Sequence, residues 1–156
     1  MILVYFSNTG QTRKFINKTG IKSYEIEFNN PFFDVDDYFV LVCPSYEPEA
    51  TDHSLDFLET GNNLTYFLGV VGCGNRNFSD LFCYTAKDIA VKYNRPYLYE
   101  FEFQGMEKDV IEIKKIMKNL ENGVEYLTPS DMGYKGLAKG NYKKGEVEIS
   151  NNKGEI

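Results

Sequence analysis

The sequence of 156 residues predicts an open, doubly wound α/β fold built on a five-stranded parallel sheet with the strand order 2-1-3-4-5. Two observations support this prediction. Short apolar segments alternate along the chain with segments of helical spacing, which is the pattern of β-α-β units. Two of the apolar segments, "YFVLVC" and "YFLGVVG", are almost continuously hydrophobic, as expected for parallel strands that helices cover on both faces.

The predicted strands are hydrophobic runs bounded by turn residues. The first run begins at Ile2 and stops where small hydroxylated residues start. The last run, "YLYEFEF", alternates polar and apolar residues, which is typical of an edge strand. The five strands are expected at Ile2–Phe6, Ser23–Phe28, Tyr38–Cys43, Phe67–Gly72 and Tyr97–Phe103.

The predicted helices fill the connections between these strands. The two longer ones carry apolar residues at helical spacing, and Pro96 or Gly123 follows their ends. The four helices are expected at Thr12–Lys18, Ser54–Leu58, Ser79–Tyr93 and Met106–Leu120.

The chain divides into one domain of residues 1–122 and a C-terminal extension of residues 123–156. Glycine is frequent in the extension, and large aliphatic side chains are sparse. We therefore expect the extension to be flexible or loosely docked, with one further strand at Glu146–Ser150.

Composition limits the classes of function. The formal net charge of −6 argues against a protein that binds nucleic acid through its phosphates. No apolar run reaches the roughly 18–20 residues of a membrane span, and because a strand-like run begins at Ile2 we expect no signal peptide. The three cysteines, Cys43, Cys73 and Cys83, show no CxxC spacing and fit free thiols in a cytoplasmic protein. With His53 as the one histidine, we expect no metal site.

The first predicted strand ends in a loop suited to a phosphate group. The first N–H groups of a helix have no intrahelical acceptor, hydroxyl groups add neutral donors, and Gly10 allows close approach of the backbone. No lysine follows in the way that a nucleoside triphosphate loop requires. The loop therefore predicts a site for one phosphate monoester, and the alternative is an ordinary capped turn. It comprises Ser7, Asn8, Thr9, Gly10, Gln11 and Thr12.

Two further loops at the same edge of the sheet offer aromatic side chains and unshielded backbone. The fourth predicted strand breaks at Gly72-Cys73-Gly74, and Phe78 follows as a stacking face, while Tyr46 follows the third strand. Together with the phosphate loop, they surround the topological switch point of the sheet. The ligand that fits a phosphate loop and two aromatic loops is FMN, whereas the alternative for the aromatic residues is packing. A dinucleotide fingerprint is disfavoured because Asn77 stands where its third glycine belongs.

The stretches "VYFSNTGQTRKFINK" and "GVVGCGNRNFSDLFC", with the later runs "KYNRP" and "FEFQGMEKDV", resemble the NrdI family, the small flavodoxin-like proteins that serve class Ib ribonucleotide reductases. The resemblance covers residues 1 to about 121. It implies an FMN protein that accepts electrons from a reductase and whose reduced flavin reacts with molecular oxygen. The resulting superoxide-type oxidant then passes to the dimanganese centre of the ribonucleotide reductase small subunit, where a tyrosyl radical forms.

The resemblance also implies which residues contact the flavin ring. Glu47, Pro48 and Glu49 depart from the glycine-rich loop that is usual there in the family. Carried over by position, the ring-contacting residues are Pro44, Ser45, Tyr46, Glu47, Gly72, Cys73, Gly74, Asn75, Asn77, Phe78 and Cys83.

The charges of the second ring loop bear on the kind of redox chemistry. It contains Arg76 and no acidic residue before Asp80, which favours full two-electron reduction of a flavin, whereas Glu47 and Glu49 of the first ring loop act in the opposite direction. Two alternatives stay open: a general electron-transfer flavodoxin, and a binding module that has kept the fold without the cofactor.

Overall fold

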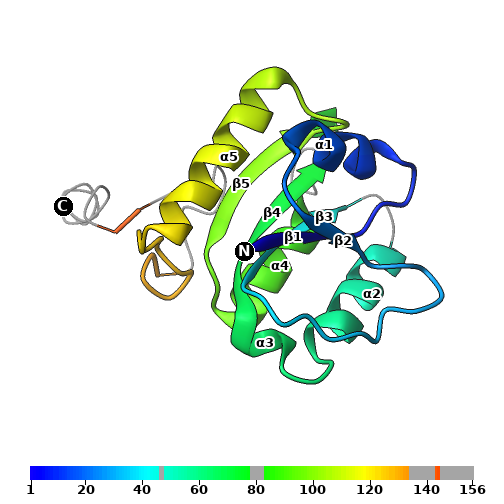
Figure 1. Cartoon of the computed structure of the whole chain (residues 1–156), viewed down its shortest axis with the longest axis horizontal. Coiled ribbons are helices and arrows are strands. Elements are labelled where there is room, and N and C mark those ends of the chain that lie inside the picture. Colours follow the sequence, from blue (N-terminus) through cyan, green and yellow to red (C-terminus); the bar gives the residue numbers. More distant parts are fainter. Residues whose placement is uncertain (46–47, 78–82, 134–142, 145–156) are drawn as a thin grey trace.

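A five-stranded parallel sheet forms the centre of the fold, with the strands in the order β2-β1-β3-β4-β5 (Figure 1). The computed structural model describes residues 1–45, 48–77, 83–133 and 143–144. The predicted doubly wound fold and its strand order are confirmed. In chain order the elements are β1 (Ile2–Tyr5), α1 (Gln11–Thr19), β2 (Ser23–Glu25), β3 (Phe39–Pro44), α2 (Pro48–Leu58), α3 (Asn63–Tyr66), β4 (Phe67–Gly74), α4 (Tyr84–Tyr93), β5 (Tyr97–Glu102) and α5 (Glu107–Glu121).

Helices cover both faces of the sheet, and each face has its own hydrophobic core. On one face, Phe57 of α2 and Ile89 of α4 pack against the sheet. On the other face, Phe15 of α1 and Ile113 of α5 do so. The central strands β1 and β3 are buried at every position, which explains why their sequences are continuously apolar.

The second strand is shorter than its sequence predicts. It ends at Glu25 and pairs only with β1, whereas the predicted strand continued to Phe28. The chain instead turns back, because the Asn30 N–H donates to the Glu27 carbonyl at 3.1 Å. The apolar residue Phe28 is 69% exposed and therefore adds nothing to the sheet core.

The fourth strand is longer than its sequence predicts. It runs through Gly74, so the predicted break at Gly72 is wrong. Gly74 pairs with Glu102 of β5, and its carbonyl accepts the Phe103 N–H at 3.1 Å. A Cβ on Gly72 would lie 2.7 Å from Cβ of Cys83, so glycine there lets the chain at the start of α4 pack directly on the strand.

The helices differ from the prediction mainly at their starts. Helix α2 begins at Pro48 and is twice as long as expected, and α3 is not predicted at all. Proline at the first helical position was the signal for the early start of α2. Helix α4 is described from Tyr84, so the predicted start at Ser79 lies outside the described residues, as does the predicted strand at Glu146–Ser150.

The first residues of the predicted C-terminal extension pack on the domain. Tyr126 is 4% exposed and belongs to the core that α5 covers, and its hydroxyl accepts a hydrogen bond from the Asn119 side chain at 3.1 Å. Ser130 exchanges two hydrogen bonds with Asn94 at the end of α4. We therefore place the end of the folded domain beyond Asn122 as a proposal, near Gly133.

Two truncations test this boundary. A chain ending after Gly133 retains the buried side chains of Tyr126 and Leu127 and loses only the exposed contacts of Lys143 and Lys144 with residues 125–131, so it is expected to be less stable than the full chain by no more than about 1 kcal/mol. A chain ending after Asn122 loses both and is expected to remain folded but to be about 3 kcal/mol less stable. Urea unfolding followed by far-UV circular dichroism measures the difference. Equal midpoints for both truncations would show that residues 123–133 do not contribute to the domain.

Candidate functional site

Three loops meet at the carboxyl edge of the sheet, where β1, β3 and β4 end at Tyr5, Pro44 and Gly74. Strands β1 and β3 are neighbours. From β1 the chain enters α1 on one face, and from β3 it enters α2 on the opposite face. The edge between β1 and β3 is therefore the topological switch point, where doubly wound folds bind their ligands.

The first loop exposes the start of a helix. Gly10 is the N-cap residue of α1, has φ of 88° in the left-handed region that glycine tolerates, and has no side chain of its own to cap the helix. The Ser7 hydroxyl accepts the Arg13 N–H at 3.2 Å, and Asn8 and Thr9 are exposed. The N–H groups of Gln11 and the next residue lack intrahelical acceptors, so they can bind an anion.

Arg13 adds a charged group to this loop that the sequence interpretation missed. Its Nε and Nη2 donate to the two carboxylate oxygens of Glu25 at 2.8 and 2.6 Å, and Glu25 also accepts the Tyr5 hydroxyl at 3.1 Å. The remaining nitrogen, Nη1, lies 3.6 Å from the position that a Cβ on Gly10 would occupy. The ion pair with Glu25 thus holds one edge of the guanidinium group and turns its other edge toward the loop.

Thr12 connects the first loop to the second. Its Oγ1 lies 3.3 Å from Sγ of Cys73, and both residues are buried. The Thr12 hydroxyl therefore makes a core contact, whereas the sequence suggested a donor to a phosphate. Cys73 faces the core shared by α1 and α5, so its side chain supports the loops from beneath.

Two polar atoms at this edge have unused hydrogen-bonding capacity. Within the described part of the chain, Oε1 of Gln11 and Oγ of Ser45 are buried and have no hydrogen-bond partner. Buried polar groups are almost always hydrogen-bonded in folded proteins. Gln11 begins α1 and Ser45 follows β3, so the two atoms belong to the loops on either side of the switch point. A ligand with polar groups fits this arrangement.

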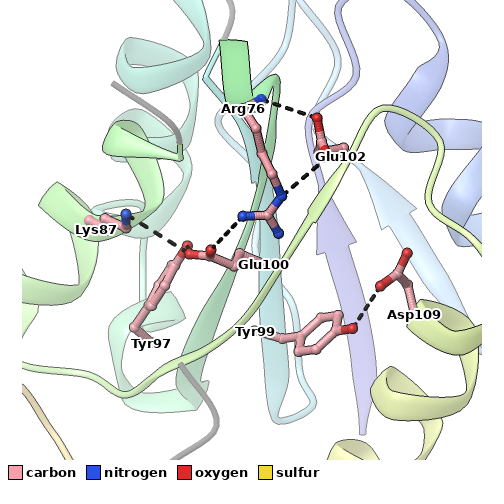
Figure 2. Close-up of polar contacts among 7 residues, drawn as sticks. All are labelled: Arg76, Lys87, Tyr97, Tyr99, Glu100, Glu102 and Asp109. Atoms are coloured by element: carbon pink, nitrogen blue, oxygen red, sulfur yellow. Dashed lines mark hydrogen bonds and ion pairs between the residues drawn. The ribbon is translucent and has the colours of Figure 1, made fainter. Parts of the chain in front are cut away.

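The second loop is held in place by hydrogen bonds of its own backbone. The Asn77 N–H donates to the Asn75 side chain at 2.9 Å. The Arg76 N–H donates to Glu102 Oε2 at 3.2 Å, and Nε of the same arginine lies 3.2 Å from Glu102 Oε1. Figure 2 shows Arg76 extended along the end of β5, where its Nη1 also reaches Glu100 at 3.4 Å.

Glu100 is a buried carboxylate with three partners. Its side chain is 7% exposed and accepts the Tyr97 hydroxyl at 2.8 Å, and Nζ of Lys87 lies 3.9 Å away (Figure 2). Burial, with the nearby Glu100 carboxylate as a lesser cause, raises the pKa of Tyr97 above its ordinary value, so this hydroxyl stays a donor. Arg76 therefore pairs with two carboxylates from β5. The second loop has no acidic residue of its own before Asp80, yet the fold brings two acidic groups to its side. The alternation of side chains along β5 could have predicted this pairing, because it places residues 100 and 102 on one face of the sheet.

The structure describes most of the predicted site residues and brings them to one edge. Gly72 and Cys83 pack in the core beneath α4, where they shape the edge from inside. Tyr46, Glu47 and Phe78 lie outside the described residues. The residues described at or beneath the three loops are Ser7, Asn8, Thr9, Gly10, Gln11, Thr12, Pro44, Ser45, Gly72, Cys73, Gly74, Asn75, Asn77 and Cys83.

The three thiols around this edge are expected to be unreactive in the folded protein. All are free and buried, and burial raises the pKa of Cys43 and of Cys83 to about 12 and that of Cys73 well above its usual value. A thiol reacts as its thiolate, and a raised pKa keeps it protonated at pH 8. Ellman's reagent should therefore label almost no thiol in buffer and three in denaturant. Rapid labelling of one thiol in buffer would contradict the buried positions.

No group of three side chains suited to a metal ion occurs among residues 1–45, 48–77, 83–133 and 143–144. In the same ranges, no helix combines the length and the apolar character that a membrane crossing requires.

The fold and its edge of three loops define the class: this is a flavodoxin-like α/β protein.

Comparison with known proteins identifies the family within this class. Residues 3–115 match the family described as NrdI flavodoxin-like. The chain is 36% identical to Protein NrdI of Enterobacter sp. (strain 638) over 121 residues, which are 73% of this chain and 89% of that protein. It is 37% identical to Protein NrdI of Bartonella tribocorum over 74% of this chain and 91% of that protein, and 35% identical to Protein NrdI of Mycobacterium leprae over 76% and 94%. The chain belongs to the NrdI flavodoxin-like family, and the resemblance noted in the sequence is confirmed.

Proposed function

We propose that this protein binds FMN and serves as the redox partner of a class Ib ribonucleotide reductase. The observation that carries the proposal is the pair of buried, unpartnered oxygens of Gln11 and Ser45 on the two sides of the switch point. In a member of this family, those atoms are where a polar, planar cofactor would satisfy hydrogen bonds that the protein leaves open.

The first loop would hold the phosphate of FMN. The N–H groups at the start of α1 would donate to it, and Thr9 and Ser7 would add hydroxyl groups. Arg13 would contribute a positive charge through Nη1, because Glu25 already binds its other edge. Gly10 has no side chain to obstruct the anion, and its left-handed backbone turns the chain into the helix.

The loops after β3 and β4 would contact the flavin ring. Ser45 would hydrogen-bond a polar edge of the ring, and the backbone of residues 74–77, fixed by Glu102 and Asn75, would line the other side. Bound FMN would supply the redox chemistry, accepting electrons from a reductase and passing them to molecular oxygen. The protein would orient the ring, hold its phosphate and set the charge beside it.

The partner in this proposal is the small subunit of a class Ib ribonucleotide reductase. The oxidant made from oxygen would be of the superoxide type, and it would activate the dimanganese centre that forms the tyrosyl radical. A net charge of −6 favours a basic docking surface and an encounter that added salt slows. Three free thiols support a cytoplasmic location.

One observation favours the alternative of a general electron-transfer flavodoxin. Glu100 and Glu102 match the positive charges of Arg76 and Lys87 beside the loop that would line the ring, so these four residues offer the ring no excess positive charge. Without such an excess, a negatively charged, fully reduced flavin gains little stabilisation, as expected for a carrier of single electrons.

Binding of FMN is common to the proposed function and to the alternative of a general electron-transfer flavodoxin, so it is tested first. Apo-protein titrated with FMN is expected to bind one equivalent and to turn yellow, with quenching of the flavin fluorescence. Riboflavin, which lacks the phosphate, is expected to bind at least tenfold more weakly, since hydrogen bonds to a charged group contribute about 1.5–3 kcal/mol. Absence of FMN binding would refute the proposed function.

A further inference from the structure

We propose that Glu100 and Glu102 are positioning residues that fix Arg76 beside the flavin and thereby set how strongly the site prefers reduced over oxidised FMN. This inference rests on the proposed function, and it concerns residues of β5 that follow the ring loop by more than twenty positions in the sequence. Figure 2 shows the two carboxylates converging on one guanidinium group.

The geometry that brings these groups together begins with two glycines. Across the β4–β5 pair, Glu100 lies opposite Gly72 and Glu102 lies opposite Gly74. Neither glycine places a side chain beside the glutamates, and next to Gly72 the space is filled by Cys83 and Ala86 at the start of α4. Arg76, which follows β4, reaches back to both carboxylates there.

The backbone of the loop is fixed together with the side chain. Glu102 accepts the Arg76 N–H at 3.2 Å while it also pairs with the guanidinium Nε. Glu100 holds the far end of the same side chain and is anchored from below by the Tyr97 hydroxyl. A buried carboxylate needs such partners, since an uncompensated buried charge costs several kcal/mol. The cluster therefore fixes the position of residue 76 relative to β5.

The cluster is also electrically balanced. Among the described residues of the cluster, the charges of Glu100 and Glu102 are matched by those of Arg76 and Lys87. Reduction of FMN by two electrons and one proton yields an anion, FMN + 2e⁻ + H⁺ → FMNH⁻, with dithionite as the electron donor in the test below. Removing one carboxylate leaves the cluster positive and favours that anion, whereas removing the arginine leaves it negative and disfavours it.

The test measures the two-electron potential of FMN bound to the purified protein. Glu100→Gln and Glu102→Gln keep the size of each side chain and remove one negative charge. Each is expected to tighten binding of reduced FMN relative to oxidised FMN by about three- to tenfold, which for a two-electron couple raises the midpoint potential by about 15–30 mV. Arg76→Gln is expected to shift the ratio in the opposite direction.

The control is Glu121→Gln, which removes the same charge from an exposed position at the far end of α5. It is expected to leave the potential unchanged. Dithionite titration in equilibrium with a reference dye gives the potential, and thermal unfolding checks that each variant is folded. If the buried Glu100→Gln variant does not fold, Glu102→Gln at the more exposed position carries the test.

The outcomes separate this inference from the proposed function. Opposite shifts for the glutamate and arginine variants support the inference, because mere loosening of the loop would move all three in the same direction. Potentials equal to that of the unaltered protein, or shifts of the same sign, overturn it while leaving FMN binding intact. Failure of the unaltered protein to bind FMN overturns the proposed function, and the inference falls with it.

Discussion

Replacing Gly72 by alanine is expected to lower the free energy of unfolding by about 3 kcal/mol. The added Cβ would lie 2.7 Å from Cβ of Cys83 and 3.0 Å from Cβ of Ala86. Neither contact is with the end of a flexible side chain, so α4 must move away from β4 to relieve the overlap. Urea unfolding of the variant measures the loss.

A second substitution tests whether this overlap is the cause. Cys83 has φ of 55°, a left-handed conformation that glycine adopts without strain. Cys83→Gly removes the nearest obstructing atom. The double variant with Gly72→Ala should therefore be more stable, by more than about 1 kcal/mol, than the sum of the two single losses in free energy of unfolding predicts. Single effects that simply add would show that the close packing of α4 on Gly72 does not limit stability.

Replacing Arg13 by glutamine is expected to weaken FMN binding by about tenfold and to leave riboflavin binding unchanged. The variant removes the charge that Nη1 presents beside Gly10 while keeping most of the side chain. The expected effect lies at the low end for a charged hydrogen bond, because the Arg13 side chain is 46% exposed and solvent screens it. Fluorescence titration with both flavins measures the two affinities.

Lys14→Gln is the matched control for Arg13, since it removes the same charge from the next residue of α1, which is also exposed. It should change FMN affinity by less than about twofold, as surface charges away from a site have small effects. If Arg13→Gln weakens both flavins equally, the ion pair with Glu25 supports the loop and does not contact the phosphate. If both basic residues have equal effects, only the net charge of the helix matters.

The sequence was sufficient to predict the sheet, because the strongest signals are local. The continuous apolar runs of β3 and β4 indicated strands covered on both faces, and the hydroxyl-rich segment after β1 marked the start of α1. The position of the three loops at one edge then followed from the parallel order alone. The ends of the elements were harder to predict. Strand β2 stops at Glu25 because the chain turns back between Glu27 and Asn30, and α2 begins at a proline within a polar segment.

The details of the site could not be read from local sequence. Gly72 looked like a break in the strand, yet it serves the packing of α4. Arg76 looked like an isolated charge, yet two glutamates of β5 neutralise it. Arg13 was overlooked because its partner, Glu25, lies on the neighbouring strand. Each of these depends on residues that are distant in the sequence and meet only when the strands pair.

Activation of a class Ib ribonucleotide reductase is the central step of the proposed function, and formation of the tyrosyl radical tests it most directly. The FMN-loaded protein is reduced with dithionite, freed of excess reductant, mixed with the manganese(II)-loaded small subunit and exposed to oxygen. Electron paramagnetic resonance is expected to detect a tyrosyl radical whose yield rises with the amount of this protein and is absent when FMN has been removed. If the flavin is reoxidised at its normal rate and no radical forms, the activating role is contradicted and the protein is a general electron carrier.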